Sequence, residues 1–135
     1  MKEEYTHCNA HDSLKQVELS RTPQRLAVLN VLINADRPLT ASEIMQTVDD
    51  DLNINKVTVY RIISTFRGKG IIREIPTNCG INYYEMACMH NPVHPHFYCR
   101  SCKTMTCLDP LTISNAWDWL SGPHDYHIEE ISITF

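Results

Sequence analysis

The sequence has no apolar run approaching the roughly 20 residues that a membrane-spanning helix requires. Its first residues, Met1-Lys2-Glu3-Glu4, lack the apolar segment of a secretory signal peptide. The chain has 4 glycines, and they form no glycine-rich phosphate loop; a nucleophile paired with a base is not evident either. We therefore expect a cytoplasmic protein that has no membrane partner and is not an enzyme.

The roles expected for the 6 cysteines depend on that compartment. Reducing thiol pools in the cytoplasm disfavour structural disulfides, which leaves metal binding or redox sensing as the alternatives. Cys8 stands alone in a polar stretch and is expected to be an incidental thiol. Cys79 and Cys88 are expected to be small core residues, with Cys88 kept as a weaker metal candidate.

Acidic residues are missing from one stretch, although the whole chain has a net charge of −4. Residues 1–78 carry 10 Lys/Arg and 10 Asp/Glu, whereas residues 79–135 carry 2 against 6. The segment 52–73 contains no acid. Its basic residues are Lys56, Arg61, Arg67, Lys69 and Arg73, and this local +5 is a candidate phosphate-binding face.

Capping residues predict three helices in the first half. Thr22 before Pro23 is typical of an N-cap followed by proline at the first helical position. Thr40 and Glu43 match the capping-box pattern, and Asn55 is a third N-cap. Apolar residues at helical spacing then predict helices over about 22–36, 40–50 and 56–67.

A β-hairpin is predicted after the third helix, because two β-branched and aromatic segments, 71–75 and 81–86, flank a turn with proline and glycine. Three helices and a hairpin are the outline of a winged helix, whose last two helices have the order of a helix-turn-helix. At 100° per residue, the outward face of the third helix carries Val57, Tyr60, Arg61, Ser64 and Thr65.

The second half differs in composition. Prolines 92 and 95 interrupt any periodicity, and short strands near 97–98 and 105–108, a helix from Asp109-Pro110 and a last strand over 131–135 are expected beyond them. We therefore predict an α+β protein with a winged helix-turn-helix DNA-binding domain at 1–86, a hinge at 87–95 and a small α/β metal-binding domain at 96–135.

Metal ligands cluster in that second half. Cys99-x-x-Cys102 is typical of half a zinc site, and no strand-to-helix setting favours the alternative of a thioredoxin-like redox motif. In an extended segment His94 and His96 point to one side and Cys99 to the other, so two sites are more consistent than one.

Glu85 and Cys107 are the residues that we expect to complete a regulatory site with the two histidines. This mixed donor set suits zinc best, with Fe²⁺ or Mn²⁺ as the alternative. Each member also has an ordinary structural interpretation, as a surface histidine or glutamate or a core cysteine. Five of the 7 histidines follow residue 89, which favours ligation; weaker candidates are Cys88, His90, His124 and His127.

Read together, both halves resemble the ferric uptake regulator family of bacterial metal-sensing repressors. The match covers nearly the whole chain, and its motifs are specific in this order rather than singly. They are Arg21-Thr22-Pro23-Gln24-Arg25, Pro38-Leu39-Thr40-Ala41, Val57-Thr58-Val59-Tyr60-Arg61, Gly70-Ile71-Ile72, Tyr84-Glu85 and His94-x-His96-x-x-Cys99-x-x-Cys102.

The resemblance implies a homodimer whose second domain is a dimerisation domain, with a regulatory metal at the hinge and a double-stranded, palindromic and AT-rich operator as its partner. It also implies that Glu85, His94 and His96 are regulatory ligands and that Cys99 and Cys102 are half of a structural zinc site. Tyr60 would pack on a thymine methyl and Arg61 on phosphate or guanine. The expected DNA-contacting residues are Arg21, Gln24, Arg25, Lys56, Val57, Thr58, Tyr60, Arg61 and Ser64.

Three departures from the family pattern bear on the metal. No second Cys-x-x-Cys follows the last predicted strand, the segment 36–39 has no histidine, and Cys107 stands where many iron-type members carry a carboxylate. The last two favour a zinc-responsive repressor of metal-uptake genes over an iron(II)-responsive or peroxide-sensing one. From another class, a zinc-ribbon protein-interaction module is the alternative, which predicts no salt-dependent affinity for DNA.

Overall fold

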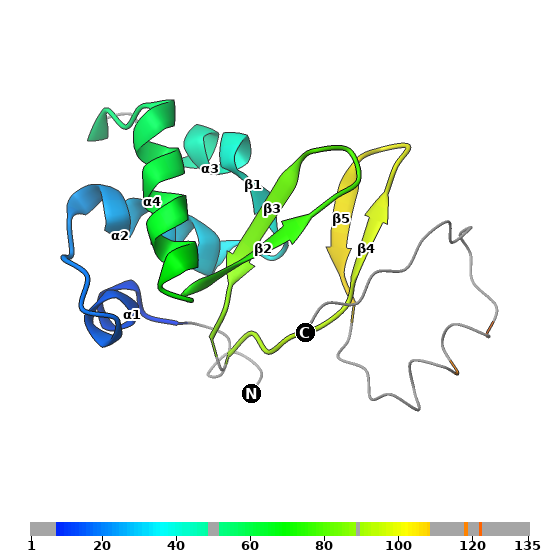
Figure 1. Ribbon diagram of the computed structural model, residues 1–135, viewed down its shortest axis with the longest axis horizontal. Helices are drawn as coiled ribbons and strands as arrows, with labels where there is room; N and C mark the ends of the chain where they lie inside the picture. The colour runs from blue at the N-terminus through cyan, green and yellow to red at the C-terminus, as the bar shows by residue number, and fades with distance from the viewer. Residues whose placement is uncertain (1–7, 49–51, 89, 109–117, 119–121, 123–135) are drawn as a thin grey trace.

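The computed structural model describes residues 8–48, 52–88, 90–108, 118 and 122 (Figure 1). Four helices and five strands are assigned in this part of the chain. The strands form two antiparallel sheets, of which the larger packs against the helices. In chain order the elements are α1 (Ala10–Gln16), α2 (Pro23–Asn34), β1 (Leu39–Thr40), α3 (Ala41–Thr47), α4 (Lys56–Gly68), β2 (Ile72–Pro76), β3 (Asn82–Met86), β4 (His96–Cys99) and β5 (Thr104–Cys107).

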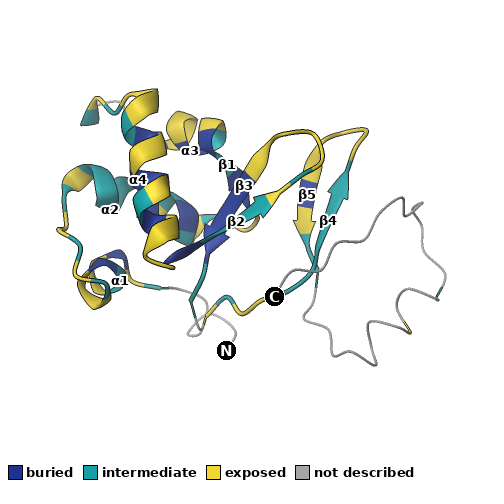
Figure 2. Ribbon diagram, viewed as in Figure 1, coloured by how far each residue is buried: buried dark blue, intermediate teal, exposed yellow. Residues whose placement is uncertain are grey.

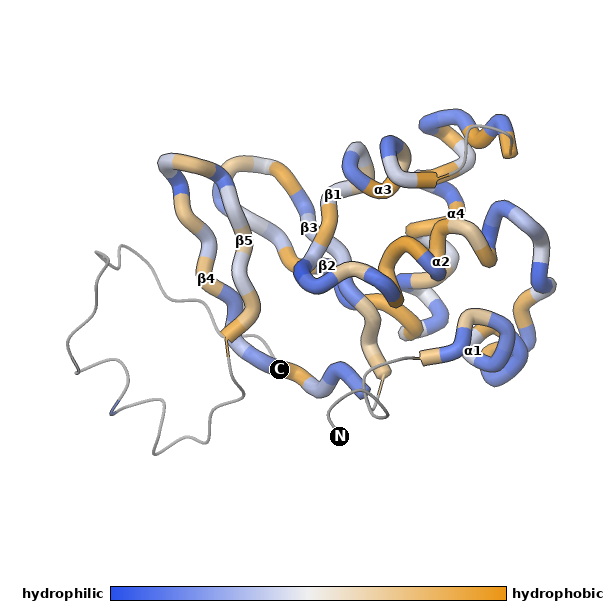
Figure 3. Tube along the Cα trace, turned by 180° about the vertical axis from the view of Figure 1, so that it is seen from behind, coloured by the Kyte–Doolittle hydropathy of each residue, from blue (hydrophilic) through white to orange (hydrophobic). Residues whose placement is uncertain are grey.

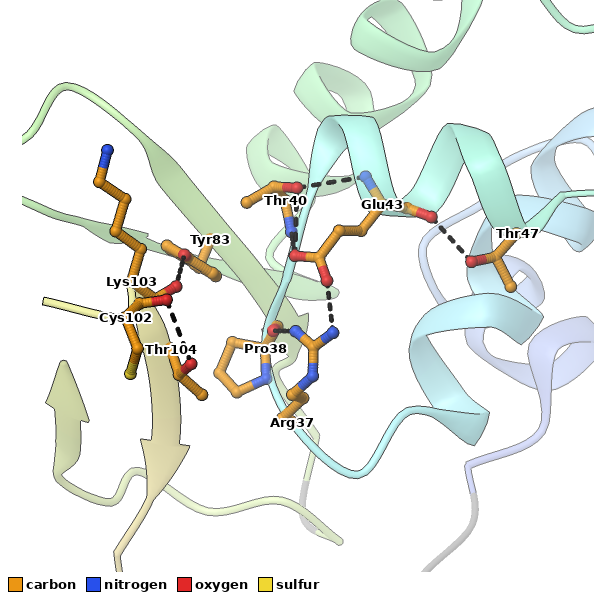
Figure 4. A network of polar contacts seen from close by, with 9 residues as sticks. All are labelled: Arg37, Pro38, Thr40, Glu43, Thr47, Tyr83, Cys102, Lys103 and Thr104. Atoms are coloured by element: carbon orange, nitrogen blue, oxygen red, sulfur yellow. Dashed lines mark hydrogen bonds and ion pairs between the residues drawn. The ribbon is translucent and has the colours of Figure 1, made fainter. Parts of the chain in front are cut away.

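The helices begin where their capping residues satisfy free backbone amides. The Thr22 hydroxyl accepts from the Arg25 amide at the start of α2, and the Asn55 side chain accepts from the Thr58 amide at the start of α4. At α3 the capping box is complete, because Thr40 and Glu43 each accept from the other's backbone N–H (Figure 4). The three helices predicted from these residues are present; α2 and α3 are shorter than their predicted ranges, and α4 extends one residue beyond its range.

The sheet behind the helices has the strand order β1-β3-β2. Ile72 pairs with Met86 in the wing hairpin, and Leu39 pairs with Tyr84 across the short third strand. Helices α1 to α4 and this sheet enclose one apolar core, in which Leu14, Leu29, Ile44, Val59 and Phe66 are almost fully buried (Figure 2). This arrangement is a winged helix, as predicted.

Two elements were not predicted from sequence, namely α1 and β1. Helix α1 has 7 residues and strand β1 has 2, which is too short for a periodic pattern to stand out. The burial of Ala10 and Leu14 and the Asn9 cap hold α1 on the core, so tertiary packing rather than local propensity forms it. No helix among the described residues is long and apolar enough to cross a membrane.

The small sheet of β4 and β5 lies beside the wing hairpin (Figure 1). The rings of Tyr83 and Tyr98 meet edge to face with centroids 6.0 Å apart, and the Tyr83 hydroxyl donates to the Lys103 carbonyl oxygen at 3.1 Å (Figure 4). Hydrophobic residues gather around α2 and α4, whereas the β4–β5 hairpin mixes hydrophobic and hydrophilic residues (Figure 3). The helix and strand predicted beyond residue 108 lie outside the described residues, and the domain boundaries stay predictions.

Candidate functional site

Four side chains from separate segments converge at the junction of the wing and the small sheet. Glu85 is on β3, His94 precedes β4, and His96 and Cys107 are directly paired across β4 and β5. One potential ligand atom from each of the four lies within 4.8 Å of the others. The structure thus brings together the four residues that we expected to form the regulatory site.

The two imidazoles face the buried Glu85 carboxylate. The Nε2 atom of His96 lies 3.1 Å from Glu85 Oε1 and that of His94 lies 3.4 Å from Oε2, while the glutamate side chain is only 5% exposed. Both Nε2 atoms are buried without a hydrogen bond of acceptable geometry. Because an unsatisfied buried nitrogen is costly, this is the arrangement that a cation between the three groups would satisfy.

The tautomer of His94 is set by its other ring nitrogen. Nδ1 lies 2.8 Å from the Pro92 carbonyl oxygen, which has no proton to donate, so Nδ1–H must be the donor. In the neutral ring this leaves the lone pair on Nε2, the atom that points to Glu85. A carbonyl behind a histidine is the usual support for a metal-binding imidazole.

Burial and the neighbouring side chains have opposite effects on the pKa of Glu85. Burial alone would raise the pKa of this carboxyl, but His96, His94 and Arg73 outweigh burial and hold the pKa below its ordinary value. Burial, followed by the negative Glu85, raises the pKa of the Cys107 thiol to about 11. The thiol donates to Glu85 Oε2 at 4.0 Å. Without a metal, the site therefore holds one carboxylate and one protonated thiol at neutral pH.

One carboxylate oxygen, two imidazole nitrogens and one thiol sulfur make up a set of four donors that fits a tetrahedral zinc ion. Fe²⁺ and Mn²⁺ accept the nitrogen and oxygen donors but are less suited to sulfur. A bound metal would supply positive charge and fixed distances between these four side chains. The residues present therefore fit a divalent transition metal.

Arg73 was not predicted to belong to this site. It pairs with Glu85 across β2 and β3, with Nε 3.2 Å and Nη2 3.1 Å from Oε1, and it donates from Nη2 to the Asn91 carbonyl oxygen at 2.6 Å. Arg73 and Arg67 both belong to the stretch that is expected to face phosphate. Arg73 is paired with the buried Glu85 instead, whereas Arg67 forms an ion pair with Glu74 at 2.8 Å and its side chain remains half exposed.

Cys99 and Cys102 lie at the tip of the small sheet, away from the four-residue cluster. Cys99 ends β4, Cys102 is exposed in the following turn, and the Lys103 amide donates to the Cys99 carbonyl oxygen at 2.7 Å. Hydrogen bonds with the Thr104 side chain, and to a lesser extent with Cys99, lower the pKa of the Cys102 thiol. In the described part of the chain, no third histidine, cysteine or carboxylate joins them.

The weaker metal candidates divide in the structure. Cys88 and His90 both lie close to Cys8. Cys8 forms a disulfide with Cys88, and its Sγ atom lies 3.5 Å from His90 Nδ1. The expectation that Cys8 is incidental and that disulfides are disfavoured is thus contradicted, because Cys8 packs beside the segment after β3. The expectation that Cys79 is a core residue is also wrong, since Cys79 is exposed in the turn between β2 and β3. His124 and His127 lie outside the described residues.

Helix α4 has an exposed outward face (Figure 2), and the side chains on this face are those expected to contact nucleic acid. Val57 is 56% and Tyr60 is 48% exposed, Arg61 and Ser64 are exposed, and Lys56 Nζ lies 5.9 Å from the centre of the Tyr60 ring. Of the other candidates, Arg21 is exposed, Gln24 and Thr58 are half-buried, and Arg25 donates to the Ser20 hydroxyl at 2.7 Å.

Comparisons with known proteins agree with this architecture. Residues 16 to 135 match the model of the ferric uptake regulator family. The peroxide-responsive repressor PerR of Staphylococcus aureus (strain Mu50) is 34% identical over 91 residues, which is 67% of this chain and 60% of the relative. The matched stretch therefore spans less than two thirds of that relative's length.

Two solved structures share the fold. The ferric uptake regulator of Vibrio cholerae superposes with a TM-score of 0.67 at 24% identity, covering 91% of this chain and 94% of that one. A zinc-bound manganese uptake regulator superposes with a TM-score of 0.71 at 19% identity, covering 93% and 95%. Members of the matched family are transcription regulators rather than enzymes. The chain belongs to the ferric uptake regulator family.

Proposed function

We propose that this protein is a metal-dependent, DNA-binding transcriptional repressor whose regulatory metal is zinc and whose targets are metal-uptake genes. The observation that carries the proposal is the convergence of Glu85, His94, His96 and Cys107, with two buried Nε2 atoms lacking hydrogen bonds. Family membership supports the regulatory class, and the donor set supports zinc.

The position of the cluster supports coupling between metal and DNA binding. Glu85 belongs to the wing, whereas His96 and Cys107 belong to the small sheet. One ion bound to all three side chains would therefore connect the wing to the small sheet. Metal binding would then favour one arrangement of the winged helix relative to the second domain. In a homodimer, that arrangement would set the spacing of the two α4 helices on a palindromic, AT-rich operator.

In this proposal the exposed face of α4 enters the major groove. Tyr60 and Val57 provide the apolar surface that suits a thymine methyl group, and Lys56 and Arg61 provide positive charge for phosphate or guanine. Cys99 and Cys102 remain a proposed half of a structural zinc site.

An iron(II)-responsive or peroxide-sensing repressor is the second candidate, and the similarity to the S. aureus peroxide-responsive repressor favours it. A cysteine at position 107 argues against it, since sulfur suits zinc better than iron(II) in such a set. Metal analysis of protein purified from zinc-replete and iron-replete cells distinguishes the candidates when each preparation is compared with His94→Ala/His96→Ala from the same cells, since the metal lost in the double variant is the regulatory one. Loss of zinc in both comparisons supports the proposal, whereas loss of iron in the second supports the alternative.

The test of function is a gel-shift titration on a duplex that the wild-type protein selects from a random pool. We expect zinc to promote binding by the wild type and to have no effect on the double variant His94→Ala/His96→Ala. His11→Ala is the matched control, since His11 is exposed on α1 and far from the cluster in sequence. An unaltered zinc response in the double variant would refute the proposal. If the DNA affinity of the wild type does not fall steeply with salt concentration, the protein-interaction alternative is favoured.

A further inference from the structure

A second group of metal-binding side chains lies at the other end of the hinge. Cys8 directly precedes the Asn9 cap of α1, and Cys88 and His90 follow β3, so 80 residues separate the two cysteines. One ligand atom from each of these three side chains lies within 4.8 Å of the others. The cysteines are half-buried against the core, whereas His90 is exposed.

This group is separate from the Glu85 cluster but opens to the same hollow. A cavity of about 380 Å³ is lined by Cys8, Cys88 and His90 on one side and by Glu85 and Cys107 on another. Only the Glu85 cluster contains the two buried unsatisfied imidazole nitrogens, and no side chain belongs to both groups. The two groups would therefore bind their ligands independently.

The backbone around the cysteine pair fits a shared metal ion better than a direct bond. The Cα atoms of Cys8 and Cys88 are 7.3 Å apart, beyond the usual range of about 4.4–6.8 Å across a disulfide. Two thiolates on one tetrahedral zinc, each about 2.3 Å from the metal, have sulfur atoms about 3.8 Å apart and so allow a wider backbone spacing. A disulfide also gives no role to His90, whose Nδ1 lies 3.5 Å from Cys8 Sγ.

We propose that, in the reduced protein, Cys8, Cys88 and His90 form a zinc site distinct from the regulatory centre. A dithiol reductant cleaves the Cys8–Cys88 disulfide, becoming a disulfide itself and leaving two thiols on the protein. Zinc binding displaces both thiol protons to solvent and takes a lone pair from each sulfur and from His90 Nδ1. Water occupies the fourth position, which the exposure of His90 leaves open to solvent.

Such a site would fasten the start of α1 to the hinge. The ion would tie the residue before the Asn9 cap to the segment that follows β3, which leads to the regulatory histidines. The DNA-binding helices and the hinge would then be linked at two places instead of one. The disulfide is the metal-free, oxidised form of the same link.

The test counts zinc in the full-length chain, using His94→Ala/His96→Ala as the background so that the regulatory site does not contribute. Reduced protein is equilibrated with zinc alone, desalted without oxygen and measured by elemental analysis. We expect Cys8→Ser and Cys88→Ser each to lose one zinc per chain and His90→Ala to bind that zinc at least tenfold more weakly. Cys79→Ser and His11→Ala are matched controls at exposed positions and should keep the background value.

A second measurement covers variants that fail to fold. In the unmutated, reduced chain, zinc should protect Cys8 and Cys88 from alkylation, as identified by peptide mass, while Cys79 reacts at the same rate with and without zinc. The proposal is overturned if Cys8→Ser keeps the background zinc content in folded protein. It is overturned equally if zinc leaves the alkylation rate of Cys8 unchanged.

Discussion

At the scale of single residues, Arg73 and Cys107 decide how the metal centre behaves before a metal arrives. With His96 and His94, Arg73 stabilises the charge of the buried Glu85 carboxylate, and it also donates to the Asn91 carbonyl oxygen. Cys107 keeps its proton because burial and Glu85 both oppose a thiolate. The metal must therefore compete with a guanidinium for one ligand and with a proton for another.

Replacing Arg73 with methionine should separate these effects. Without the guanidinium, the nearly buried Glu85 loses its cationic partner, so the metal-free protein should be less stable by about 1–3 kcal/mol. Zinc should bind more tightly, because it no longer competes with a positive charge for Oε1. Urea unfolding in chelator and a zinc competition titration measure the two quantities. Equal stability of variant and wild type would show that the ion pair has no structural role.

The raised pKa of Cys107 predicts the pH dependence of zinc affinity. A thiol with a pKa of about 11 is protonated at neutral pH, so zinc must displace this proton, and affinity should rise roughly tenfold per pH unit from pH 7 to 8.5. Glu85 is already ionised there, because its pKa is lowered. In Cys107→Asp the new carboxylate is ionised too, and the slope should nearly vanish. A slope shared by both proteins would assign the proton to another group.

At the scale of elements, the sequence predicted structure where local chemistry determines it. Thr22, Thr40 and Asn55 marked the starts of α2, α3 and α4, because their side chains satisfy nearby backbone amides. The alternation of His94 and His96 likewise placed both imidazoles on one side. The contact of Arg73 with Glu85 depends on strand register and that of Cys8 with Cys88 on how α1 packs beside the segment after β3, so neither was predictable from the sequence. The short helix α1 depends on its Asn9 cap and on the packing of Ala10 and Leu14 against the core.

The capping box of α3 provides a stability test. Thr40→Ala removes the acceptor of the Glu43 amide and should lower the free energy of unfolding by about 1 kcal/mol.

Burial opposes the charge of Glu43, but Arg37 and Thr40 lower its pKa overall (Figure 4). A lowered folded-state pKa stabilises the protein above the unfolded pKa, and this contribution disappears as the pH falls through the folded value. The stability difference between wild type and Glu43→Gln should accordingly shrink below about pH 4.5 in urea unfolding; a difference that grows on acidification would contradict this sign.

The exposed face of α4 can be tested without harm to the core. Tyr60→Ala should weaken operator binding at least tenfold, since an aromatic contact is lost at a residue that is 48% exposed and outside the buried core. Arg61→Gln should reduce the slope of log affinity against log salt concentration by about one, the value expected for one phosphate contact. Lys15→Gln is the matched control, because Lys15 is an exposed cation on α1 and belongs to none of the proposed DNA-contacting residues. An equal change of slope in the control would mean that only overall charge matters.

At the scale of the whole molecule, the winged helix and the small sheet meet at the cluster of Glu85, His94, His96 and Cys107. Tyr83 and Tyr98 already bring the two sheets together, but Glu85, His96 and Cys107 provide the contact that a metal would strengthen. The net charge of −4 does not prevent DNA binding, since acids are absent over residues 52–73, which contain α4. Metal binding and DNA binding are therefore expected to be coupled through one shared arrangement.

Thermodynamic linkage tests this coupling most directly. The affinity for the selected duplex is measured with and without zinc, and the affinity for zinc is measured with and without the duplex, in wild type and in His94→Ala/His96→Ala. Coupling predicts that zinc tightens DNA binding and that DNA tightens zinc binding by the same factor, which disappears in the double variant. Zinc that leaves the DNA affinity of the wild type unchanged, or a factor that persists without the two histidines, would contradict the account.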